Sequence, residues 1–339
     1  MAQQPRLESR PLSNSDSCMD VRGACLADKA LWDARPWSPV SRMMQRAVLG
    51  TSKLPGVDPF GEIQPLSRVQ NQDDAPVHLR QNGRLQRRQT WAFALSYFGS
   101  AFHGTAWQPG KQTVKSAMEK ALNTILPAPP AVELAGRTDK GVSALASVCS
   151  FYSWYPLCND DILRAINDYS DVDVPSGSLR ACDARKVPRS FHATFSTKWR
   201  HYAYFVPLFA DDTISAELLD AQLATLVGPP RDFRAFGRGL PRKKSTTCQF
   251  FHASAQRVEL DKDVNAIRID VVGDRFIRKQ MRVLVSSAVY AAGVADEAGV
   301  WGRRGELLQM ASCGDSSSTP PPAPSMGLIF VRCGQYEWE

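Results

Sequence analysis

One short loop of this sequence combines the residue types that bond-breaking chemistry uses. Residues 136–141 read Gly-Arg-Thr-Asp-Lys-Gly, so one carboxylate, Asp139, stands between the cations Arg137 and Lys140. A carboxylate at such a tip can act as a nucleophile or as a base, and a cation beside it keeps it ionised. The same composition also suits a plain capped turn, in which Thr138 or Asp139 accepts nearby backbone N–H groups.

Apolar segments on both sides predict that buried strands hold this loop. Val132 and Leu134 end one apolar segment, and a second apolar run extends from Val142 to Phe151. The two glycines allow the backbone to turn sharply between them. Functional residues often lie on loops carried by a rigid scaffold, so we expect Asp139 at the tip between two strands.

The pattern before the loop predicts a strand, a glycine-containing loop and a helix. Residues 91–97 have the aromatic and apolar composition of a strand. Apolar residues then recur at helical spacing over 114–126, with Thr113 as the expected N-cap and Pro127 as the stop. The same criteria predict helices at 160–169, 214–227, 276–292 and from about Asp296, and strands at 178–184, 199–206, 247–258, 266–272 and 327–333.

Two of these later elements carry polar side chains on a defined face. In the strand at 199–206, alternation puts Tyr202 and Tyr204 on the same face. In the helix at 276–292, Arg278 and Arg282 are four residues apart and share a face outside the apolar stripe. Both halves of the chain mix strands with helices placed on one side, which predicts an α+β fold.

The first 89 residues differ in composition from the rest of the chain. They are rich in Pro, Ser, Gln and Asn and lack strong periodicity, so we expect 1–89 to be a mostly disordered extension before the two halves 90–210 and 211–339. Its arginines suit an organelle transit peptide, whereas its acidic residues argue against one. The basic run from Arg80 to Arg88 is either a solvated linker or an RNA-contacting arm.

Bulk properties set limits on function. The 339 residues are 43% hydrophobic and carry a formal charge of +7, which is consistent with a nucleic-acid partner. The eight cysteines are scattered without a C-x-x-C pair or a Cys/His cluster, so we expect no zinc site and free thiols. No apolar run approaches the roughly 20 residues of a membrane span.

The loop string Gly-Arg-Thr-Asp-Lys-Gly-Val-Ser-Ala resembles the signature of the TruA family of tRNA pseudouridine synthases. The resemblance covers residues 91 to about 333, with the usual Asp replaced by Phe98 and the usual Arg by Thr194. Further matching strings are Tyr97–Ser100, Phe102–Gly104, Gln108–Pro109, Phe191–Ser196, Arg200–Tyr204, Asp232–Phe236, Gly273–Arg282 and Gly327–Leu328. Ser143, Ala106 and Gln280 favour the eukaryotic pseudouridine synthase 3 branch.

The resemblance implies a function and a set of roles. The chain would isomerise uridine to pseudouridine in the tRNA anticodon stem-loop, with Asp139 as the nucleophile, Arg282 as its partner and Tyr202 as the platform for the flipped base. It implies a central, largely antiparallel sheet with an RNA-binding cleft between the halves, no cofactor, and a possible homodimer. The expected RNA-binding side chains are those of Arg137, Lys140, Arg242, Lys243, Lys244 and Arg278.

Two other functions remain open at this point. The chain could be a non-catalytic RNA-binding relative that acts within a ribonucleoprotein. A phosphate-binding turn is a weaker alternative, because residues 136–141 lack the G-x-x-x-x-G-K-[ST] spacing. The compartment stays undecided between cytoplasm or nucleus and an organelle, a mitochondrion or a plastid, because the extension satisfies only part of the transit-peptide pattern.

Overall fold

The computed structural model describes residues 32–58, 78–81, 84–172, 174–210, 212, 214–241, 243–261, 264–293 and 306–335. The chain divides into two compact units. The first comprises residues 1–41 and 202–328, and the second comprises residues 42–201 and 329–339.

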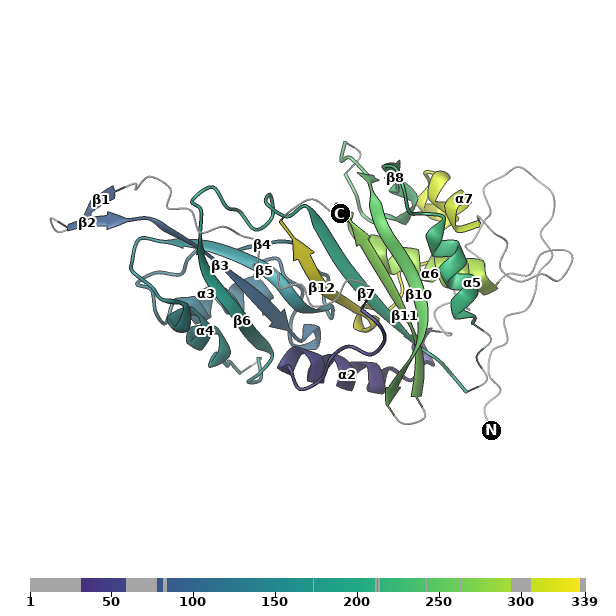
Figure 1. Ribbon diagram of the computed structural model, residues 1–339, viewed down its shortest axis with the longest axis horizontal. Coiled ribbons are helices and arrows are strands. Elements are labelled where there is room, and N and C mark those ends of the chain that lie inside the picture. The colour runs from purple at the N-terminus through teal and green to yellow at the C-terminus, as the bar shows by residue number, and fades with distance from the viewer. Residues whose placement is uncertain are drawn as a thin grey trace, which may run out of the picture. The chain divides into compact units, whose positions relative to one another are not determined.

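The second unit contains four sheet strands in the order β12-β5-β3-β6, with the short β4 paired to β5 (Figure 1). β3 pairs antiparallel with both β5 and β6, whereas β12 pairs parallel with β5. Their bounds are β3 (Gln89–Tyr97), β4 (Glu133–Leu134), β5 (Ser143–Ser153), β6 (Leu179–Val187) and β12 (Leu328–Gly334). Eight of the nine residues of β3 are buried, which fits its composition and its place between two strands.

Two helices pack against this sheet. α4 (Asn159–Asn167) packs on β6, and α3 (Val114–Leu122) packs on α4. The helix predicted over 114–126 ends earlier, at Leu122, and its apolar residues up to that point are buried. The Thr113 side chain accepts a hydrogen bond from the Ser116 N–H, as predicted for an N-cap. Ser116 bonds back to the Thr113 N–H, and the Val114 and Lys115 N–H groups donate to the Gly104 and Thr105 carbonyls, each at 3.1 Å. All four open donors at the start of the helix are thus satisfied.

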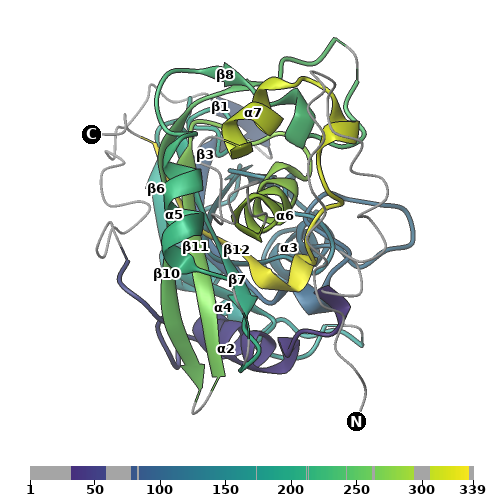
Figure 2. The ribbon, with the colours of Figure 1, turned by 90° about the vertical axis from the view of Figure 1, so that its right-hand side faces the viewer.

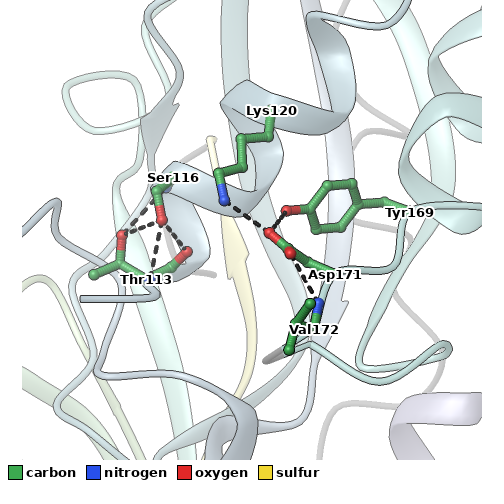
Figure 3. A network of polar contacts seen from close by, with 6 residues as sticks. All are labelled: Thr113, Ser116, Lys120, Tyr169, Asp171 and Val172. Atoms are coloured by element: carbon green, nitrogen blue, oxygen red, sulfur yellow. Dashed lines mark hydrogen bonds and ion pairs between the residues drawn. The ribbon is translucent and has the colours of Figure 1, made fainter. Parts of the chain in front are cut away.

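A polar network joins α3 to the segment that follows α4 (Figure 3). The ammonium group of Lys120 lies 2.7 Å from a carboxylate oxygen of Asp171, and the Tyr169 hydroxyl donates to the same carboxylate at 3.1 Å. The bond from Lys120 lowers the pKa of Asp171. Both charges are partly exposed, so the pair contributes little energy and mainly fixes how α3 and this segment pack.

The first unit has a different order of elements. Its sheet runs β10-β11-β7, and β8 and β9 form a separate antiparallel pair. The strands are β7 (Trp199–Pro207), β8 (Arg231–Asp232), β9 (Thr247–Cys248), β10 (Phe250–Asp261) and β11 (Val264–Gly273). α5 (Ala216–Ala224) packs on β10, and α6 (Gln280–Gly293), seen almost end-on in Figure 2, packs on α5 and on α7 (Glu306–Ser312).

The predicted α+β class is confirmed. Antiparallel pairing predominates in the strand pairs of each unit, with β12 and β5 as a parallel exception. The Tyr202 and Tyr204 rings of β7 contact different aromatic partners, Phe276 and Trp32, and the predicted shared face stays a prediction. Among the described residues, no helix has both the length and the apolar character needed to cross a membrane.

The segment 32–58 corrects the expectation of a mostly disordered extension. α2 (Trp37–Leu49) is a helix of 13 residues, and most of its apolar side chains are buried, although Leu49 at its end is exposed. The buried positions are Val40, Met43, Met44, Ala47 and Val48. These positions follow helical spacing, but the helix is so polar on its other face that its composition resembles that of a solvated segment.

The residues before α2 are tied to the first unit. The buried Arg35 guanidinium donates to the Pro207 carbonyl at 2.7 Å and lies 2.5 Å from the Asp212 carboxylate. The rings of Trp32 and Trp37 meet Tyr204 edge-on at centroid distances of 6.3 and 6.4 Å. A buried charge with a paired carboxylate is costly to break, so this segment is an integral part of the fold.

The basic run before β3 is also ordered. β1 (His78–Gln81) pairs antiparallel with β2 (Arg84–Arg87), and β2 leads into β3 (Figure 1). The run therefore forms a hairpin, and its two predicted roles, a solvated linker or an RNA-contacting arm, both stay predictions. The rest of the extension, 1–31 and 59–77, lies outside the described residues.

The start of α6 differs from the prediction. Lys279 has a φ of 65° and separates Arg278 from the helix, which begins at Gln280. The Gln280 side chain accepts from the Ile277 N–H at 2.7 Å and so closes the turn before the helix. Arg278 and Arg282 therefore do not share a helix face. The predicted helix start near Asp296 lies outside the described residues, and α7 is found at Glu306–Ser312.

Most of the described cysteines are free thiols, namely Cys149, Cys158, Cys182, Cys248 and Cys333. Burial raises the pKa of the Cys248 thiol to about 11, so this thiol is protonated and unreactive at neutral pH. Cys313 is in a disulfide, so the expectation of free thiols is wrong at that position. Spacing along the sequence does not determine which cysteines meet in the fold.

The buried face of α2 leads to a test of its contribution to stability. Met44→Ala removes a side chain that is 1% exposed and should lower the free energy of unfolding by about 2–5 kcal/mol. Gln45→Ala, on the exposed face, is the matched control and should change it by less than about 0.5 kcal/mol. Urea unfolding followed by circular dichroism measures both. Equal midpoints for the two variants would show that α2 does not pack in solution.

Candidate active site

The Gly136–Gly141 loop joins β4 to β5, as the flanking apolar segments predicted. Asp139 is half-buried, whereas Arg137 and Lys140 are exposed on either side of it. The Val142 N–H donates to the Asp139 carbonyl at 3.2 Å and closes the turn. The loop therefore presents one partly shielded carboxylate between two solvated cations.

Thr138 is the anchor of this loop. Its N–H donates to the Thr105 hydroxyl at 2.9 Å, and its carbonyl accepts from the Thr105 N–H at 3.2 Å. Its own hydroxyl shares a 2.9 Å hydrogen bond with the buried Tyr97 hydroxyl at the end of β3. Both backbone groups of the residue before Asp139 are thus satisfied by Thr105, which fixes the direction in which the aspartate backbone continues.

Two glycines let the neighbouring backbone approach the loop. A Cβ at Gly104 would lie 2.9 Å from the Thr138 carbonyl oxygen, and Gly104 has a φ of +93°. A Cβ at Gly99 would lie 2.3 Å from the Val142 carbonyl carbon. Distances under 3.0 Å to backbone atoms cannot be relieved by a rotating side chain, so only glycine fits at either position.

A second loop, Phe191–Thr197, supports the strand that leads into the Gly136–Gly141 loop. The Thr194 hydroxyl donates to the Leu134 carbonyl at 2.7 Å. The Arg200 guanidinium donates to the Ala135 carbonyl at 2.9 Å and to the Thr194 carbonyl at 3.3 Å. Thr194 stands where the TruA motif has arginine, and its hydroxyl holds the strand end directly.

Tyr202 belongs to the first unit and lies on β7. Its side chain is 6% exposed, and its ring meets Phe276 edge-on at a centroid distance of 4.8 Å. Phe276 in turn stacks with Phe250, and Phe250 stacks with Phe233. The tyrosine is thus one end of an aromatic row, and its expected role as a platform for a base stays a prediction.

Arg282, in the same unit, is held by a proline-rich segment, Thr319–Pro324. Its Nε donates to the Ala323 carbonyl at 2.6 Å, and its own carbonyl accepts from the Ala323 N–H at 3.0 Å. The Tyr204 hydroxyl donates to the neighbouring Pro324 carbonyl at 2.9 Å. Prolines restrict φ and supply only acceptors, so this segment is suited to binding donors such as these.

Arg238 fastens the other end of the same segment. Its guanidinium donates to the Thr319 carbonyl, the Thr319 hydroxyl and the Pro320 carbonyl at 2.8–3.2 Å. It also donates to the Ala235 and Gly237 carbonyls, each at 2.9 Å. Arg238 belongs to the same basic stretch, residues 231–244, as the predicted RNA-binding residues Lys243 and Lys244, but its guanidinium donors are used within the protein.

The predicted RNA-binding residues of the first unit show different degrees of exposure. Lys243, Lys244 and Arg278 are exposed, and the Arg278 guanidinium lies over Gly239 in the basic stretch. Arg242 lies outside the described residues. Among the described residues, no group of three or more His, Cys, Asp and Glu side chains could hold a metal ion.

The three residues expected to be catalytic belong to different units. Asp139 lies in the second unit, and Tyr202 and Arg282 lie in the first. Sequence reasoning missed the supporting roles of Thr105, of Gly104 and of Arg238. The matching motif strings near Gly104 and Thr105 could have indicated that these residues support the loop. No pattern near Arg238 indicated its role, because two of its acceptors are 81 and 82 residues away in the sequence.

Gly104 can be tested against a glycine of the same loop. Gly104 and Gly110 both have positive φ, so alanine costs each about 1–2 kcal/mol in backbone strain. A Cβ at Gly110 has no neighbour within 4 Å, whereas at Gly104 it meets the Thr138 carbonyl. Gly104→Ala should therefore lower the midpoint of urea unfolding clearly more than Gly110→Ala. Equal midpoints would mean that the loop is not clamped as described.

Arg238 can be tested against an exposed cation nearby. Arg238→Lys keeps the charge but cannot span five acceptors, and should cost about 2 kcal/mol or more through unsatisfied buried carbonyls. Lys243→Ala should be near neutral because its side chain is exposed. Thermal unfolding of both variants gives the comparison, and a neutral Arg238→Lys would remove Arg238 from the support of the proline-rich segment.

Comparisons with known proteins complete the description of the site. No protein-family model matches the chain. A curated "tRNA pseudouridine synthase A" of Gloeobacter violaceus is 30% identical over 261 residues, covering 72% of this chain and 79% of the relative. Proteins with the same description from Neisseria gonorrhoeae (31% identity, 60% of this chain, 78% of the relative) and Chlorobaculum tepidum (29%, 72% and 97%) are also similar.

A solved structure of a Cbf5-Nop10-Gar1 complex is similar over 60% of this chain and 45% of that chain, at 12% identity. Its TM-score of 0.30 is too low to bear on the fold. The three sequence relatives are bacterial, so the expected eukaryotic branch stays a prediction. Their identity and the coverage of their full length, together with the anchored Asp139 loop, lead to one conclusion: the chain belongs to the tRNA pseudouridine synthase A family, the TruA family.

Proposed function

We propose that this chain is a tRNA pseudouridine synthase that acts on uridines of the anticodon stem-loop, with Asp139 as its nucleophile. Membership of the family supports the reaction class, since the relatives carry that description. One observation carries the proposed role of Asp139. The residue before it, Thr138, is anchored to Thr105 through both its N–H and its carbonyl.

The reaction is an isomerisation, so its atoms balance without a co-reactant. The bond from the ribose C1′ to N1 of uracil breaks, the base turns, and a bond from C1′ to C5 forms. C5 loses a proton and N1 gains one. The protein must supply a carboxylate that can attack or accept a proton, and a site that holds the detached base in place.

A uridine within a stem is reached only after it has left the base stack. Extrusion costs a few kcal/mol, and stacking on an aromatic ring returns about 1–3 kcal/mol. In our proposal Tyr202 supplies that ring, Arg282 stabilises the negative charge of Asp139, and the exposed Arg137 occupies the space that the base leaves. These roles rest on the family resemblance of the three positions.

Exposed cations would hold the tRNA backbone. Lys140 stands beside the aspartate, and Lys243, Lys244 and Arg278 gather near the basic stretch of the first unit. Phosphate contacts of this kind position RNA without reading its sequence. The expected homodimer stays a prediction, as does the choice of uridine.

The proposal predicts a clean separation of binding from turnover. Asp139→Asn keeps the size of the side chain but removes its charge and its nucleophilic oxygen. The purified variant should fold, bind an unmodified anticodon-arm RNA within about twofold of wild type, and form no detectable pseudouridine, a loss of at least about a thousandfold for a residue of the reacting group. Chemical mapping of pseudouridine in the incubated RNA measures the product.

The matched control is Asp160→Asn, an exposed aspartate in the first turn of α4 of the same unit, which should retain wild-type turnover. Product at the wild-type level from Asp139→Asn would contradict the mechanism. If wild-type protein binds the RNA but modifies none that is offered, the non-catalytic RNA-binding alternative is favoured instead.

A further inference from the structure

An aromatic pair stands on the surface of the second unit outside the roles assigned so far. Phe195 is 81% exposed, and its ring lies 4.4 Å from the His192 ring, at 35° to its plane. Most phenylalanine side chains are buried, but a single exposed one needs no functional explanation by itself. Here the exposed ring is backed by a second ring, which leaves its outer face open.

The loop that carries the pair is rigid. The Ser196 N–H donates to the His192 carbonyl at 2.8 Å, and the His192 N–H donates to the Ser196 hydroxyl at 3.1 Å. The Thr194 N–H donates to Nδ1 of His192 at 3.2 Å, which orients the imidazole. The Ala193 N–H is bound to the Ser150 hydroxyl on β5 at 2.9 Å. The two rings are therefore preorganised, and little conformational entropy is lost when a ligand stacks on them.

The same loop is bonded to the backbone that leads to Asp139. The Thr194 hydroxyl, one residue from Phe195, holds the Leu134 carbonyl, and Gly136 begins the catalytic loop two residues later. Exposed cations border the pair in sequence on both sides, at Arg189 and Lys198. An open ring face, on a segment that cations flank in the sequence and that is bonded to the strand before the catalytic loop, suits a single-stranded nucleic acid. The bases of such a strand stack on aromatic rings while cations neutralise its phosphates.

We propose that the His192–Phe195 pair is a stacking platform for an unpaired base of the RNA substrate, distinct from the uridine that is modified. The platform rests on the proposed function in that the RNA is the substrate of the Asp139 loop. It would hold one loop base of a hairpin next to the catalytic turn. It would thereby favour targets in which unpaired bases lie close to the reacting uridine.

Binding of two RNAs tests the platform. The first is an anticodon-arm hairpin with a fluorescent adenine analogue in its loop, and the second is a blunt duplex of equal length. Phe195→Ala should weaken hairpin binding by about five- to a hundredfold, as loss of one stacked base does, and leave duplex binding unchanged. The quenching of the analogue on binding should disappear. Phe195→Trp should restore both, because it retains an aromatic face.

Two controls separate stacking from folding. Phe195→Ala should melt at the wild-type temperature, because the ring is 81% exposed. Tyr152→Ala removes a different aromatic ring, 48% exposed and near the C-terminal end of β5, and should leave hairpin binding and quenching unchanged. Wild-type hairpin affinity in Phe195→Ala, an equal loss on the duplex, or full rescue by Phe195→Leu would each overturn the platform.

A failure of the platform can be distinguished from a failure of the proposed function. Pseudouridine formation by the wild-type preparation is measured on the same hairpin. Phe195-dependent binding without any product supports the platform and refutes the isomerase. Normal product with Phe195-independent binding refutes the platform and leaves the isomerase in place.

Discussion

The position of Asp139 depends on how the backbone of Thr138 is bound. Its N–H and its carbonyl are both paired with Thr105, and its hydroxyl meets Tyr97 at the end of β3. Gly104 must be glycine for Thr105 to come this close. A catalytic group has to be held within a fraction of an ångström. In this loop one main-chain bond and two hydroxyl bonds fix the residue before Asp139.

The first unit uses a different device to hold its arginine. A proline-rich segment offers carbonyls to Arg238 at one end and to Arg282 and Tyr204 at the other. Burial raises the pKa of the Tyr204 hydroxyl well above its usual value, while the charges of Arg282 and Arg35 oppose this shift. The hydroxyl therefore stays protonated and remains a donor to the segment across the physiological range. Hydrogen bonds from charged guanidinium groups to carbonyls are stronger than those between neutral groups, so the two arginines hold the proline-rich segment firmly.

Local patterns predicted the strands around the Gly136–Gly141 loop, the cap at Thr113 and the α+β class, because these depend on neighbours in sequence. They failed for α2, where Val40, Met43, Met44 and Val48 repeat at helical spacing within a segment of polar composition. They also gave no signal for Arg238, which donates to Thr319, 81 residues further along the chain. Contacts between residues far apart in the sequence determine the structure at these positions, and local sequence patterns do not reveal such contacts.

The most direct test of the account is a map of pseudouridine in tRNA from cells with and without this protein. We expect that cells lacking it lose pseudouridine at positions of the anticodon stem-loop, and that the wild-type gene restores them. A gene encoding Asp139→Asn, expressed at the same level, should restore none. An unchanged map in the deficient cells, or restoration by Asp139→Asn, would contradict the claim that Asp139 carries out this isomerisation.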